Sequence, residues 1–105
     1  MIVRLSGADA TSIARHVLNE AYEFPASTAA HVRFRVRDLP SFPGWLYAFR
    51  SPKSVTGEDV VELHIPGNPL LARMLLDDLI KYGARQADPG EFTARAYFNG
   101  RIDLV

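Results

Sequence analysis

The chain of 105 residues contains no cysteine, which excludes disulfide scaffolds, thiolate metal sites and a cysteine nucleophile. The formal net charge is zero, because 12 Lys and Arg residues balance 12 Asp and Glu residues. This balance argues against a strongly basic surface that binds nucleic acid by counterion release alone. No apolar run approaches the roughly 18 residues of a membrane-spanning helix, and no signal-peptide pattern begins the chain. We therefore expect a cytoplasmic protein.

Known nucleotide and metal motifs are missing as well. The phosphate-binding loop GxxxxGK[ST], the dinucleotide fingerprint GxGxxG and the zinc motif HExxH do not occur. Three histidines, His16, His31 and His64, lack the spacing of metal ligands, and each is most simply interpreted as a surface or edge histidine. We expect no metal site, no catalytic residue and no GTP hydrolysis within these residues.

What is present is a length and a composition suited to one folded domain, since 48% of the residues are hydrophobic. Four segments have the apolar alternation or β-branched content of strands. These predicted strands are Ile2–Leu5, His31–Asp38, Trp45–Phe49 and Asp59–Ile65.

Apolar residues at three- and four-residue steps predict two helices, and a third is indicated by its cap. A capping box of Ser6 and Asp9 should start the first, which runs to about Glu20. Asn68 and Pro69 should start the second, which Gly83 ends, and Asp88-Pro89 should start a shorter helix that ends near Gly100. The order of these strands and helices along the chain predicts an α+β fold with a mixed or antiparallel sheet and two to three helices.

Two charged residues interrupt apolar strands. Glu62 lies within Val-Val-Glu-Leu and Arg4 within Ile-Val-Arg-Leu. If the Glu62 carboxylate faces inward, it needs donors or a cation, whereas simple strand alternation would expose it to solvent. Arg4 leaves the same two alternatives open, and the exposed arrangement is the more common one for both residues.

Two further patterns allow both a binding role and a structural role. The alternating Arg33, Arg35 and Arg37 could bind phosphates, although a solvated strand face, or one paired with acids of a neighbouring strand, is the more common arrangement. The aromatic residues at 45, 47 and 49 could stack on a planar ligand, although alternating aromatics in a strand usually belong to the core.

Several blocks resemble the N-terminal domain of the MnmE/TrmE family of tRNA-modification GTPases. They are Ile2-Val3-Arg4-Leu5-Ser6-Gly7, Thr56-Gly57-Glu58-Asp59-Val60-Val61-Glu62-Leu63, Gly83-Ala84-Arg85 and the long block from Pro89 to Leu104. The resemblance covers nearly the whole chain and is weakest between residues 20 and 45. Their order and approximate spacing match the family as well.

The resemblance implies a function that composition does not reveal. Members of the family modify the wobble uridine of certain tRNAs together with a flavin-dependent partner protein. Their N-terminal domain resembles the folate-binding fold of the glycine-cleavage aminomethyltransferases, forms a homodimer, and binds 5-formyltetrahydrofolate or a related tetrahydrofolate near the dimer interface. GTP, Mg²⁺ and K⁺ would bind only in a separate GTPase domain, and tRNA would bind to the full assembly. No membrane role is implied.

Carried over by motif, the resemblance assigns folate contacts to Arg4, Glu62 and Arg101, where the family usually has lysine at the last position. A carboxylate suits a pterin, because both of its oxygens can accept the paired N–H groups of the aminopyrimidine edge. One segment departs from the family, since Ile65-Pro66-Gly67-Asn68-Pro69 replaces the usual Gly-His-Gly-Gly-Pro. The alternative is therefore a divergent dimerisation or protein-interaction module that no longer binds folate. We also expect the 105 residues to be a fragment or isolated domain of a longer protein.

Overall fold

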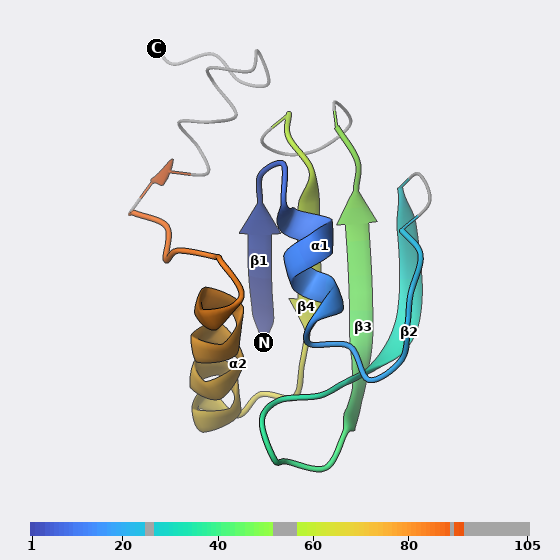
Figure 1. Ribbon diagram of the computed structural model, residues 1–105, viewed down its shortest axis with the longest axis vertical. Coiled ribbons are helices and arrows are strands. Elements are labelled where there is room, and N and C mark those ends of the chain that lie inside the picture. The colour runs from blue at the N-terminus through green and yellow to red at the C-terminus, as the bar shows by residue number, and fades with distance from the viewer. Residues whose placement is uncertain (25–26, 52–56, 89, 92–105) are drawn as a thin grey trace.

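A four-stranded antiparallel sheet organises the computed structural model, which describes residues 1–24, 27–51, 57–88 and 90–91 (Figure 1). Its strands lie in the spatial order β1-β4-β3-β2. The strands are β1 (Ile2–Ser6), β2 (Thr28–Phe34), β3 (Phe42–Phe49) and β4 (Val60–His64), and the helices are α1 (Ala10–Arg15) and α2 (Pro69–Lys81). The α+β prediction is confirmed, and the sheet is the antiparallel of the two alternatives.

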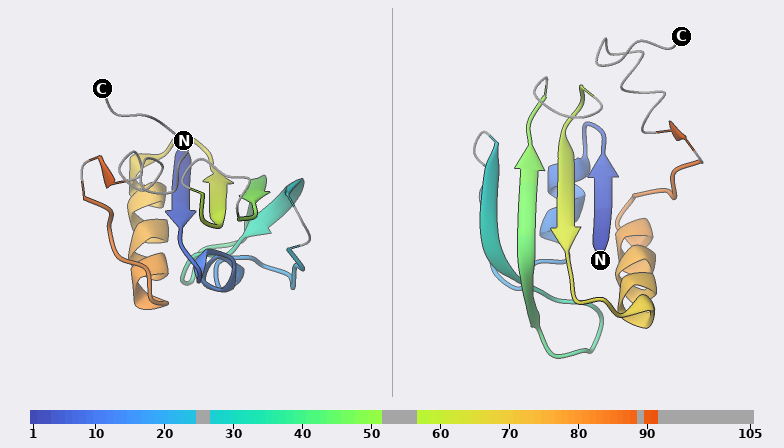
Figure 2. Two further views of the ribbon diagram at one scale, coloured as in Figure 1. Left: turned by 90° about the horizontal axis from the view of Figure 1, so that it is seen from above. Right: turned by 180° about the vertical axis from the view of Figure 1, so that it is seen from behind.

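Both helices cover the same face of the sheet. Helix α1 crosses in front of the strands in Figure 1 and α2 flanks the edge formed by β1, whereas the view from behind shows the strands with no helix over them (Figure 2). The buried face consists of alternate strand residues, because neighbouring side chains of a strand point to opposite sides. Fully buried members of this core include Phe34, Leu46, Leu63, Leu75 and Leu79.

Helix α1 is shorter than the periodicity predicts. It ends at Arg15 rather than near Glu20. It begins at Ala10 with Asp9 as its N-cap, so the predicted capping box, with Ser6 as the cap, is wrong. The chain then becomes extended, because Leu18 forms a β-bridge with Phe34 at the edge of the sheet. Val17 and Leu18 are nevertheless buried, as their apolar pattern requires.

Helix α2 follows its sequence signals closely. Asn68 accepts hydrogen bonds from the backbone N–H groups of Leu70 and Leu71 at 3.0 and 3.2 Å, and Pro69 occupies the first turn. Gly83, at φ +116°, follows the C-cap residue Tyr82. The buried residues Ala72, Leu75 and Leu79 form the face that packs into the core.

Strand β2 begins earlier and ends earlier than the predicted segment 31–38. Its alternation is confirmed, since Phe34 and Val36 are fully buried while Arg33 and Arg35 are exposed. The regular pattern stops at Arg37, whose φ of 48° is unusual for a residue with a side chain. Strand β3 also starts three residues before the predicted Trp45 and includes Pro43 and Gly44.

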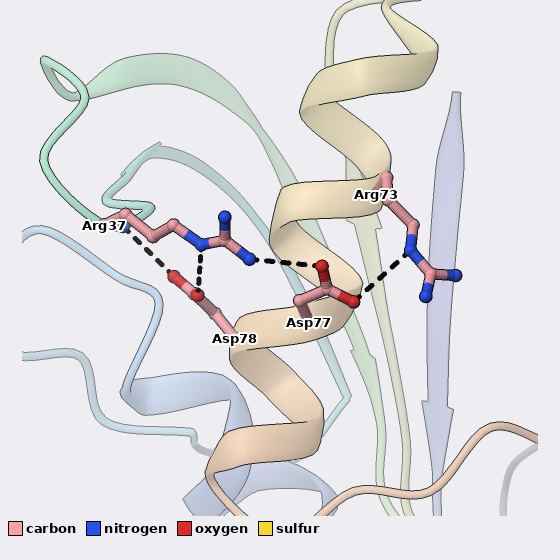
Figure 3. A network of polar contacts seen from close by, with 4 residues as sticks. All are labelled: Arg37, Arg73, Asp77 and Asp78. Carbon is pink, nitrogen blue, oxygen red and sulfur yellow. Dashed lines mark hydrogen bonds and ion pairs between the residues drawn. The ribbon is translucent and has the colours of Figure 1, made fainter.

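Arg37 lies in the loop after β2 and contacts α2 (Figure 3). Its backbone N–H and its Nε donate to the two carboxylate oxygens of Asp78 at 3.0 and 3.1 Å, and its Nη2 donates to Asp77 at 3.1 Å. Asp77 also pairs with Arg73 at 3.3 Å, one helical turn earlier. These contacts hold the loop after β2 against the helix and raise the pKa of Arg37, chiefly through the hydrogen bond to Asp78.

Most of the predicted third helix lies outside the described part of the chain, as does Arg101. Within the described residues, neither helix has the length and apolar character needed to cross a membrane.

Candidate functional site

The helix-free face of the sheet carries the polar and aromatic side chains that alternate with the core residues. Register places them in two rows that run across the strands. One row is Ile2, His64, Trp45 and His31, and the other is Arg4, Glu62, Tyr47 and Ala29. Residues far apart in the sequence therefore meet on one surface.

Glu62 is the centre of this surface. Arg4 donates from Nε and Nη2 to Oε2 of Glu62 at 3.0 and 2.7 Å, and His64 Nε2 lies 3.1 Å from Oε1. Because a carboxylate only accepts, His64 serves as a donor here, with its proton on Nε2. The Glu62 side chain is 17% exposed. It is therefore neither buried in the core nor fully exposed to solvent, which were the two alternatives from the sequence. It faces away from the core, yet its neighbours shield it.

These contacts change the acidity of Glu62. Partial burial by itself would raise the pKa of the carboxyl group, but the hydrogen bonds from His64 and Arg4 and the nearby positive charge outweigh this effect. The pKa of Glu62 therefore falls below its ordinary value of 4.5.

Stability should depend on this carboxylate in acid. A carboxyl group whose pKa is lowered by folding stabilises the native state fully above its unfolded pKa, and this contribution disappears as pH falls through the folded pKa. We expect the difference in unfolding free energy between the native chain and Glu62→Gln to narrow below about pH 4.5. Urea unfolding at about pH 6 and about pH 3.5 measures the difference. If the difference in unfolding free energy between the native chain and Glu62→Gln became larger in acid, the assigned direction of the pKa shift would be contradicted.

Aromatic rings continue the surface from Glu62 toward β2. The Tyr47 ring lies 4.6 Å from His64 and 6.4 Å from Trp45, and Trp45 lies 5.2 Å from His31. Trp45 is 47% exposed, so the prediction that these aromatics are core is wrong for it. The reason is that Leu46 and Ala48, on the opposite side of β3, fill the core beneath the helices.

The structure thus brings together two of the three residues predicted to bind folate, Arg4 and Glu62, while Arg101 lies outside the described residues. Sequence reasoning missed His64, which was interpreted as an ordinary surface or edge histidine. Its position two residues after Glu62 was a usable signal, because residues i and i+2 of a strand share a face. No group of three or more potential metal-ligating side chains occurs among the described residues.

A pterin-like donor edge fits this carboxylate only in part. An ionised carboxylate has about four acceptor positions, and three are taken by the N–H groups of Arg4 and His64. Two parallel N–H donors need both oxygens, so one of the Arg4 bonds has to be given up when such an edge binds. Arg4 is 42% exposed and has room to move.

A pocket of about 310 Å³ lies between the turn after β1 and the C-terminal end of α2. Arg4, Ile13, Leu79 and Arg85 are among its lining residues, whereas Glu62 is not. Arg4 therefore borders both this pocket and the surface around Glu62.

Comparison with known proteins identifies the family. The family described as "GTP-binding protein TrmE N-terminus" matches residues 1–101. Proteins named tRNA modification GTPase MnmE are similar over nearly the whole chain: 43% identical over 98% of it in Nitratiruptor sp., 44% over 98% in Synechococcus sp. and 38% over 99% in Thermotoga maritima. The chain spans only 23% of the length of each of these relatives. The chain therefore belongs to the TrmE family and corresponds to the N-terminal part of its members.

Proposed function

We propose that this chain is a tetrahydrofolate-binding and dimerisation domain of a tRNA-modification GTPase that acts on the wobble uridine of tRNA in the cytoplasm. The observation that carries the proposal is the shielded Glu62 carboxylate with Arg4 bonded to it at 2.7 Å. The names of its relatives support the link to tRNA modification and to a GTPase.

The chemistry of the two residues suits a reduced folate. Glu62 supplies a carboxylate for the N–H groups of a pterin, and the guanidinium of Arg4 can bind a formyl oxygen or the glutamate tail once it leaves Glu62. The adjacent aromatic rings of Tyr47 and His64, 4.6 Å apart, offer apolar contact to a bicyclic ligand. GTP hydrolysis, the flavin-dependent partner and tRNA binding belong in this proposal to the full-length protein and its assembly.

Calorimetric titration with 5-formyltetrahydrofolate tests the binding site. We expect saturable binding to the folded chain and loss of that binding in Glu62→Ala, because the pterin edge then has no acceptor. Glu20→Ala is the matched control, since Glu20 is an exposed acid outside the sheet. Equal binding by Glu62→Ala and the native chain would reject Glu62 as the ligand.

A second function is favoured by one specific observation. His64 and Arg4 already occupy three acceptor positions of Glu62, and Ile65-Pro66 follows the strand where the family usually has Gly-His. A divergent module that dimerises or docks without folate explains both features. In that case the chain sediments as a dimer in analytical ultracentrifugation and shows no heat of folate binding, whereas a monomer at high concentration contradicts it.

A further inference from the structure

The polar atoms around Glu62 form an ordered row of hydrogen-bond donors and acceptors. Arg4 donates from Nη2 to Oε2 at 2.7 Å, and His64 Nε2 lies 3.1 Å from Oε1 at the other end. Both oxygens of an ionised carboxylate only accept, so the row has the order donor, acceptor, acceptor, donor. A ligand that is complementary to the whole row needs two neighbouring N–H groups with an acceptor on either side of them.

His64 is held in position at its end of this row. It lies on the same face of β4 as Glu62, since alternate residues of a strand point to the same side. Its ring packs against the Tyr47 ring of β3, with the centroids 4.6 Å apart and the planes inclined by 55°. The His64 side chain is 32% exposed, so a ligand can still reach it. Its N–H is therefore a positioned donor beside Oε1 of Glu62.

A 2-amino-4-oxopyrimidine ring has the complementary edge. Along this edge lie the 4-oxo oxygen, the N3–H, the 2-amino group and the lone pair of N1, in the order acceptor, donor, donor, acceptor. The oxygens of Glu62 can accept the central N–H pair once Arg4 gives up one of its bonds, and a donor then lies at either end. A 2,4-diaminopyrimidine ring does not match this row, because its N3 has a lone pair and its 4-amino group donates.

We propose that His64 is a specificity-determining residue of this site and that its Nε2–H binds the 4-oxo group of the ligand. Oε2 accepts two N–H groups from Arg4, whereas Oε1 accepts one from His64. The 4-oxo oxygen projects beyond the ring and needs more room than N1, so it lies at the less crowded Oε1 end. The formyl group on N5 is next to the 4-oxo group, which leaves the glutamate tail to Arg4. This inference rests on the proposed folate site and gives it a preference for 4-oxo over 4-amino pteridines.

Two ligands that differ only at position 4 of the pteridine test the assignment. In calorimetric titration, the native chain should bind 5-formyltetrahydrofolate at least about tenfold more tightly than its 4-amino-4-deoxy analogue. His64→Leu should weaken the binding of 5-formyltetrahydrofolate by at least about fivefold and should not weaken that of the 4-amino analogue. His64→Gln should keep the preference within about twofold of the native value, because a carboxamide N–H also donates.

His16→Leu is the matched control, because it removes a histidine that stacks on Tyr82 at 4.2 Å, beside the helices, and it should keep the native preference. Circular dichroism establishes that each variant is folded. Equal weakening of both ligands in His64→Leu overturns the inference, since this is the result expected if His64 only supports Glu62. Guanosine has the same ring edge, and tighter binding of guanosine than of 5-formyltetrahydrofolate overturns the assignment to a pteridine.

A measurement without ligand separates this inference from the folate proposal. Nitrogen NMR spectroscopy of the imidazole should show the proton of neutral His64 on Nε2 in the native chain and a mixture of both tautomers in Glu62→Ala. A proton on Nδ1 in the native chain overturns the role of His64 even if folate binds. If the tautomer is as expected but the folded chain binds no 5-formyltetrahydrofolate, the proposed function and the specificity assigned to His64 are both rejected.

Discussion

Substitution of Gly44 by alanine is expected to destabilise the fold by about 3 kcal/mol or more, at the upper end of what overpacking costs. A β-carbon at this position of β3 would lie 2.5 Å from Cε2 of the Phe34 ring and would also overlap the carbonyl oxygen of His64. The Phe34 ring is fully buried and the second group is backbone of the neighbouring strand, so neither can move without disturbing the sheet. A domain of this size has only about 5–15 kcal/mol of stability, and the loss should be evident in urea unfolding.

Gly67 provides the control for Gly44. A β-carbon added there meets nothing within 4 Å, so Gly67→Ala should change the unfolding free energy by no more than about 0.5 kcal/mol. Similar unfolding midpoints for the two alanine variants would mean that β3 and β4 do not approach as closely as the structure has them.

Truncation of Leu63 to alanine is the second change with a large expected effect, a loss of about 2–5 kcal/mol. Leu63 is fully buried at the centre of β4, with Val3 beside it on β1 and Leu46 on β3. Removal of its side chain leaves a cavity that three strands and the covering helices border, and such a site cannot collapse easily. Urea denaturation followed by circular dichroism measures the loss.

Leu70→Ala is the matched substitution, because Leu70 is 69% exposed in the first turn of α2 and alanine favours a helix. It should alter stability by less than about 0.5 kcal/mol. A comparable loss in both variants would place Leu63 outside the core. Leu63 also separates stability from binding, since its neighbour Glu62 faces the opposite side of the sheet.

The sequence predicted best those elements whose local signals agree with their surroundings. Asn68, Pro69 and Gly83 mark the ends of α2, and the apolar positions between them identify the face that packs into the core. Strand β3 shows where this reasoning fails, because both of its faces are apolar and alternation cannot tell which one the helices cover. The end of helix α1 was predicted wrongly because the same apolar pattern allows two structures. Val17 and Leu18 are buried where the chain pairs with the sheet, and not by a continuation of the helix.

The candidate site was less accessible to sequence reasoning than the fold. Arg4 and Glu62 are 58 residues apart, and no periodicity or spacing indicates that they form an ion pair. Both residues were singled out because they interrupt apolar strands, but their predicted folate role depended on the family resemblance. The comparison with known proteins confirmed the family, whereas the role in binding folate stays a prediction. For Arg37, pairing with acids of a neighbouring strand was one expectation, but its partners Asp77 and Asp78 lie on α2. This contact depends on a backbone turn at positive φ that no motif marks.

The pairing of β1 with β4 has a consequence for how the chain folds during synthesis. Strands β2 and β3 each pair with the strand next along the sequence, but β1 leaves the ribosome first and its partner β4 follows more than fifty residues later. Closing such a loop costs conformational entropy, and only the contacts of the completed sheet offset this cost. We therefore expect β1 to join the folding nucleus late. Arg4 and Glu62 belong to this last-formed pair, and their ion pair therefore forms only when the whole sheet is assembled.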